Sequence, residues 1–66
     1  MENITIIINE RYDLRNPAIE KQLRANGFEA VNYLDSIGAI VGNADSSRIE
    51  FIEAIEGVAW VEKNPA

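Results

Sequence analysis

Three glutamates, Glu50, Glu53 and Glu56, recur at a spacing of three in a stretch with helical periodicity, so they would fall on roughly one side of a helix. Paired carboxylates can act as a general acid and a general base, but only in a concave site that shifts their pKa values. A helix side in contact with solvent provides no such site. The spacing therefore favours a solvated acidic surface over a catalytic pair.

The other charged candidates are equally weak as sites of chemistry. Arg11 and Arg15 stand between the expected first strand and first helix, where an anion could bind, but the glycine-rich phosphate cradle that should accompany them is missing. Asp35 and Asp45 lack the repeated oxygen-ligand spacing that calcium or magnesium needs, and roles in a turn and a helix cap account for both. We expect no catalytic residue, no metal site and no cofactor.

The composition excludes whole classes of function. The chain of 66 residues has no cysteine and no histidine, which rules out disulfides, thiolate or imidazole metal sites, and Ser/His or Cys/His nucleophile pairs. The net charge of −5 repels a phosphate backbone, so we expect no nucleic-acid partner. We predict a non-enzymatic protein with a single domain, residues 1–66.

The start of the chain, MENITIIINE, carries no targeting signal that we recognise. Its apolar run is far too short to span a membrane, and the basic region that opens a signal peptide is missing. We therefore expect a cytoplasmic protein without a membrane partner.

The first half of the chain predicts a strand and a helix. The run ITIIIN, residues 4–9, is almost entirely β-branched, which predicts a central strand buried on both faces. Asn16 as the cap and Pro17 at the first helical position predict the start of a helix, and Gly27 predicts its end. Ile19 and Leu23 give this helix its apolar face.

The second half predicts a hairpin, a helix and a final strand. Two apolar runs, Phe28 to Leu34 and Ile37 to Val41, flank the turn formers Asp35 and Ser36. A helix follows with Asp45 or Ser47 as its cap, with Ile49, Ile52 and Ile55 on its apolar face, and with Gly57 as its end. The last predicted strand runs from Val58 to Glu62.

The order β-α-β-β-α-β predicts an α+β fold, the ferredoxin-like sandwich. Right-handed crossovers place both helices on one face of a four-stranded antiparallel sheet with the order 4-1-3-2. The opposite face stays free of helices. Because this fold hosts many unrelated functions, it decides none of them.

Trp60 has two possible positions in such a sheet. If Ala59 and Val61 point inward, alternation sends Trp60 to the helix-free face, where a large ring would stand partly in water and could anchor a partner. If the alternation is inverted, Trp60 is instead the largest residue of the core. The sequence leaves both positions open.

The segment DSSRIEFIEAIEGVAWVEKN, residues 45–64, resembles the second helix and last strand of the subtilisin propeptide-like inhibitors. That family includes the chaperone pro-domains of subtilisins and free-standing inhibitors of such proteases. The shared pattern is a polar cap, a helix with apolar residues at spacing three, a glycine, and a strand of the form Val-x-aromatic-Val-Glu. The run SIGAIVGNA resembles another strand of the family, with Ile40 in place of an aromatic residue and Ala39 in place of a glycine.

The resemblance implies that the helix-free face docks on a subtilisin-like serine protease. In the family, acidic residues after the last strand cap the N-termini of two protease helices, where a carboxylate is stabilising. Glu62 matches the first acid, and the neutral Asn64 stands near the second. In the family, a tail of several residues follows this segment and lies in the active-site cleft of the protease. Pro65 and Ala66 are too short to form such a tail.

Two functions are therefore expected from the sequence. The first is a protein-binding module that resembles these inhibitors and intramolecular chaperones. The alternative is a small regulatory or self-association domain of ACT-like architecture, which would be a homodimer. The partner-binding residues expected for the first function are Trp60, Glu62, Val41, Ala39 and Asn64.

Overall fold

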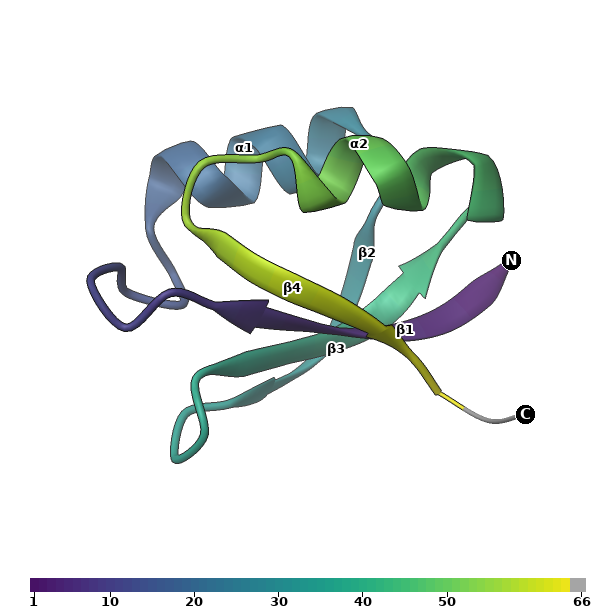
Figure 1. Cartoon of the computed structure of the whole chain (residues 1–66). Coiled ribbons are helices and arrows are strands. Elements are labelled where there is room, and N and C mark those ends of the chain that lie inside the picture. The colour runs from purple at the N-terminus through teal and green to yellow at the C-terminus, as the bar shows by residue number, and fades with distance from the viewer. Residues whose placement is uncertain (65–66) are drawn as a thin grey trace.

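Two helices cover one face of a four-stranded sheet in the computed structural model, which describes residues 1–64 (Figure 1). Residues 65–66, which are too short to form the cleft tail of the inhibitor family, lie outside the described residues. The elements in chain order are β1 (Glu2–Ile8), α1 (Pro17–Ala25), β2 (Glu29–Leu34), β3 (Ala39–Ala44), the 3-10 helix η1 (Ser46–Arg48), α2 (Ile49–Glu53) and β4 (Val58–Lys63). Neither helix of residues 1–64 is long and apolar enough to cross a membrane.

The strand order is β2-β3-β1-β4, and every neighbouring pair is antiparallel. This is the predicted order 4-1-3-2 counted from the other edge, so the predicted α+β architecture is confirmed. β1 is central, as expected from its β-branched residues. Both helices lie over the same face of the sheet (Figure 1).

The central strand is buried on one face only, which corrects the expectation that both of its faces are buried. Ile4, Ile6 and Ile8 are buried under the helices, whereas Thr5 and Ile7 on the other face are only half-buried. At Thr5 and Ile7, β-branched side chains favour the strand conformation itself and do not require a buried position.

The core lies between the sheet and the helices. Ile19 and Leu23 of α1 and Ile49 and Ile52 of α2 are buried, as predicted from their spacing. The buried core cluster consists of Ile4, Ile6, Ile8, Leu14, Ile19, Leu23, Phe28, Ile40, Ala44, Ile49 and Ile52.

The predicted caps start both helical segments. The side chain of Asn16 accepts hydrogen bonds from the amides of Ala18 (2.9 Å) and Ile19 (3.3 Å). Asp45 accepts from the amide and the hydroxyl of Ser47, at 2.9 and 2.7 Å. The same hydrogen bonds from Ser47 lower the pKa of the Asp45 carboxyl below its ordinary value.

The second helix is shorter than predicted. It begins with the turn of 3-10 helix η1 and ends at Glu53, so Ile55 belongs to the connection that leads to β4. Ile55 is half-buried and still packs against the core, as its place in the apolar pattern predicted.

The hairpin turn is longer than predicted and takes in Ile37. The turn covers residues 35–38, and Ile37 is 63% exposed there rather than being part of β3. Gly38 has a φ of 67°, a left-handed conformation that glycine adopts without strain, and the strand resumes directly after it.

Each edge strand carries one extra residue that interrupts its pairing. Ala30 and Asn32 pair with consecutive residues of β3, which leaves Val31 as a bulge in β2. Trp60 and Val58 likewise pair with Ile7 and Ile8, which leaves Ala59 as a bulge in β4.

The bulge in β4 corrects one expectation from the sequence. Ala59 is exposed rather than inward, and Val58 packs against the core instead. The extra residue in the bulge reverses which side chains face the core before it, so the alternation of inward and outward side chains expected from the sequence holds only from Trp60 onward.

Candidate functional site

We call the side of the sheet opposite the two helices the open face (Figure 1). Because Ile4, Ile6 and Ile8 face the helices, the residues between them face the other way, and their cross-strand partners share that side. The residues placed on the open face are Asn3, Thr5, Ile7, Glu29, Asn32, Leu34, Ala39, Val41, Asn43, Trp60 and Glu62.

One end of the open face is an apolar row that crosses all four strands. Ile7 pairs with Trp60 on one side and with Ala39 on the other, and Ala39 pairs in turn with Leu34. We call these four residues the apolar row. Its only strongly exposed side chain is Trp60, which has 52% of its surface in solvent.

The other end of the open face is a row of amides. Asn3 pairs with Asn43, which pairs with Glu29, and the side chain of Asn3 donates to Asn43 Oδ1 at 3.2 Å. Asn64 Nδ2 donates to Asn3 Oδ1 at 2.7 Å, and Asn64 Oδ1 accepts from the hydroxyl of Thr5 at 2.9 Å. We call Asn3, Asn43 and Asn64 the amide ladder.

A mixed row separates these two ends. Thr5 stands between Val41 on β3 and Glu62 on β4, and Val41 pairs with Asn32 of β2. The open face therefore changes from apolar to polar along the strands, from the Trp60 end to the Asn64 end.

Trp60 lies on the open face, which decides between the two positions that the sequence left open. Its indole Nε1 donates to Glu62 Oε2 at 3.2 Å. The two residues stand two apart on one strand and so point to the same side. The carboxylate of Glu62 is therefore the hydrogen-bond partner of the indole on this face.

The other expected partner-binding residues differ in their access to solvent. Val41 is half-buried in the middle row, whereas Ala39 is completely buried under its neighbours and offers no surface of its own. Asn64 is fixed by its two side-chain hydrogen bonds and by its amide, which donates to the carbonyl of Asn3 at 2.9 Å. Asn64 thus holds the segment after β4 on the open face.

The charged residues considered for chemistry are spread over the rest of the surface. Glu50, Glu53 and Glu56 are exposed. Arg15 forms an ion pair with Asp35 at 2.6 Å, which holds the pKa of the Asp35 carboxyl below its ordinary value. Residues 1–64 contain no cluster of three potential metal-ligating side chains.

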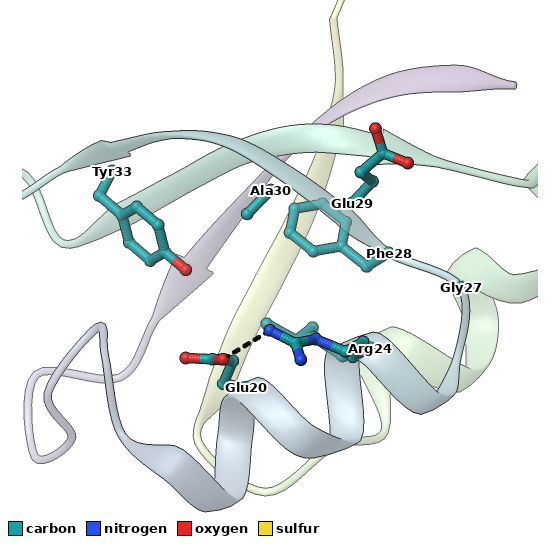
Figure 2. Close-up of a pocket in the computed structure, with 8 residues that line it drawn as sticks. Glu20, Arg24, Gly27, Phe28, Glu29, Ala30 and Tyr33 are labelled. Carbon is teal, nitrogen blue, oxygen red and sulfur yellow. Dashed lines mark hydrogen bonds and ion pairs between the residues drawn. The ribbon is translucent and has the colours of Figure 1, made fainter.

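A groove lies between α1 and β2 on the helix side of the sheet (Figure 2). Phe28 and Tyr33 point toward α1 from the strand side, and an ion pair between Glu20 and Arg24 (2.8 Å) lies on the helix side. The carboxylate of Glu29 points away from α1 in the same view, in accord with its place on the open face. The groove therefore contributes nothing to the open face.

Sequence reasoning missed the partners that complete the open face. Ile7, Asn3 and Asn43 were not among the expected binding residues, although Ile7 lies beside Trp60 and Asn3 forms hydrogen bonds with both Asn43 and Asn64. The alternation of β1 could have placed Ile7 on this face. Only the strand register could have revealed the amide ladder.

Comparison of the chain with known protein families, curated proteins and solved structures finds no match.

Proposed function

We propose that this chain is a non-enzymatic protein-binding module that docks its open face on a subtilisin-like serine protease, as an inhibitor or an intramolecular chaperone. The observation that carries the proposal is Trp60, a large ring half exposed on a sheet face that no helix covers. Tryptophan is enriched among residues that dominate binding energy, and a ring held in place loses little freedom on binding. The proposal includes the cytoplasmic location expected from the sequence.

The arrangement around Trp60 supports this choice. Ile7 pairs with Trp60 and extends the apolar surface beside the ring, and the amides of Asn3 and Asn43 form a polar margin toward the other end of the face. A protein interface usually combines a buried apolar area with polar groups at its border, and the apolar row and the amides supply one of each at opposite ends of the open face. The carboxylate of Glu62 beside the ring can accept from the amides at a helix N-terminus of the partner. The protease itself is supported by the sequence resemblance alone.

The test compares Trp60→Ala with Phe51→Ala, an equally exposed aromatic residue on the helix side, 55% exposed against 52% for Trp60. Binding to a subtilisin-like protease is measured by inhibition and by calorimetry, with circular dichroism to verify folding. We expect Trp60→Ala to weaken binding by about 2 kcal/mol or more and to leave the fold intact. Phe51→Ala should leave the affinity unchanged.

The wild-type protein also decides between the two functions expected from the sequence. A monomer that binds the protease supports the inhibitor proposal. If the wild-type protein does not bind any subtilisin-like protease at micromolar concentration, the inhibitor proposal fails and self-association takes its place.

A further inference from the structure

The open face carries charge of one sign only. The strands place two ionisable side chains on it, Glu29 on β2 and Glu62 on β4, and both are carboxylates. Within residues 1–64, the ion pairs join Arg15 with Asp35, Arg24 with Glu20, and Lys63 with Glu2, so none neutralises either carboxylate. The net charge of −5 adds to the negative potential of this face.

The two carboxylates lie on the same side of the apolar row. Glu29 pairs with Asn43 and Glu62 pairs with Thr5, both beyond the row that contains Ile7 and Trp60. Three strand spacings separate β2 from β4, which places the carboxylates about 14 Å apart across the sheet. On the other side of the apolar row, Glu10 and Arg11 of the loop after β1 lie beside Trp60 and add one charge of each sign, so this side gains no net charge from them.

We infer that the partner of the open face is a protein surface with an aliphatic strip bordered on one side by lysine or arginine. The strip covers the apolar row, and the cations lie toward Glu62 and Glu29. This inference rests on the proposed use of the open face for docking and adds the chemistry and the orientation of the partner. A charged surface of this kind steers the encounter and fixes the orientation of the complex more than it adds affinity.

The same charges argue against the other occupants of this face. A second copy of the chain would offer a face whose own strand carboxylates are also negative, so it supplies no cation that matches Glu29 and Glu62. Anionic lipid and nucleic acid are repelled by the negative charge of this face.

The experiment uses two synthetic peptides as probes, so it does not depend on any protease. Both peptides have the same length and the same leucine strip, and they differ only in having lysine or glutamate along one border of the strip. Binding at low salt is followed by the fluorescence of Trp60 and by the backbone amide signals of Thr5, Ile7 and Glu62. We expect the lysine peptide to shift these signals and to bind at least about tenfold more tightly than the glutamate peptide.

Two double variants separate local contacts from net charge. Glu29→Gln with Glu62→Gln removes both carboxylates of the open face, and the glutamine at 62 can still accept from the indole of Trp60. Glu50→Gln with Glu53→Gln removes the same charge from the exposed side of α2. We expect the double variant on the open face to weaken the affinity for the lysine peptide about threefold to tenfold, the range for two exposed ion pairs. The double variant on α2 should change this affinity by less than about twofold.

Equal binding of the lysine and glutamate peptides would overturn the inference, and so would equal losses in the two double variants. A chain that discriminates between the peptides but binds no subtilisin-like protease would support the inference and refute the proposed protease partner. Failure of each proposal is thus seen in a different measurement.

Discussion

At the scale of single residues, the sequence assigns one glycine to a place where no side chain fits. Gly42 of β3 faces the helices beneath the ring of Phe28, and a Cβ at this position would clash first with the backbone carbonyl of Glu29 and would also lie 2.5 Å from Phe28 Cζ. Phe28 is itself buried against this strand. The small residue therefore lets the ring close the core at the β2 edge of the sheet.

We expect Gly42→Ala to destabilise the protein by about 1 to 3 kcal/mol, because the ring and the strand must move to admit the methyl group. Denaturant titration measures the loss. Ala44→Gly on the same strand is a useful comparison, since it removes a buried methyl group where Gly42→Ala inserts one. A Gly42→Ala variant as stable as the wild type would show that Phe28 does not pack on this glycine.

A hydrogen bond between Tyr12 and Glu56 joins the loop before α1 to the loop before β4. Tyr12 Oη donates to Glu56 Oε2 at 2.6 Å. This hydrogen bond raises the pKa of the Tyr12 phenol above its ordinary value, and the negative charge of Glu56 adds to the effect. Because the folded chain holds this proton more tightly than the unfolded chain, the contribution to stability is present below the pKa of an unfolded tyrosine, about 10, and disappears as the pH rises through the folded pKa.

We expect Glu56→Gln to return the pKa of Tyr12 toward its ordinary value, because the amide accepts the hydrogen bond without a charge. The ultraviolet absorbance of tyrosinate measures this titration, and Tyr12→Phe identifies it by leaving only Tyr33 to titrate. An unchanged titration in Glu56→Gln would mean that the two side chains do not interact in solution.

Among the helices and strands, the sequence predicted the features that depend on a few neighbouring residues, such as the helix caps. Asn16 and Asp45 begin their helical segments as expected, since a cap needs only its own side chain and the next two or three amides. The bulges at Val31 and Ala59 were not predicted, because a bulge exists only in relation to the strand beside it. The early end of α2 at Glu53 also escaped the apolar pattern, since Ile55 remains in the core after the helix has ended.

The second helix provides the test at this scale. Ile52 is completely buried, as predicted from its spacing, and we expect Ile52→Ala to cost about 2 to 5 kcal/mol. A domain of this size has a free energy of unfolding of only about 5 kcal/mol or slightly more, so the variant should be partly unfolded at room temperature. Circular dichroism with denaturant titration measures the loss, and a loss below about 1 kcal/mol would contradict the place of Ile52 in the core. Phe51→Ala on the exposed side of the same helix is the control.

At the scale of the whole molecule, the fold was predictable and the organisation of the open face was not. The order of elements fixes the sheet order through the handedness of the crossovers. The apolar row and the amide ladder depend on the registers of β1 with β3 and of β1 with β4, which join residues about 30 to 40 and about 50 to 60 positions apart. The sequence left two positions open for Trp60, and its pairing with Ile7 in the register of β1 with β4 places it on the open face.

The oligomeric state is the last prediction, and it follows from the edges and the charge of the sheet. Ala59 in β4 and Val31 in β2 interrupt both exposed edges with a bulge, a device that prevents one sheet from pairing with another. Face-to-face pairing would bury Glu29 and Glu62 of both copies without a cation from the strands of the other open face. We therefore expect a monomer of 7.4 kDa at neutral pH in sedimentation experiments, at protein concentrations up to the high micromolar range. Glu29→Gln with Glu62→Gln should begin to associate if the apolar row is otherwise able to pair, whereas Glu50→Gln with Glu53→Gln should stay monomeric. A wild-type dimer would contradict this prediction and would favour the self-association domain, in which Trp60 faces a second copy of the chain.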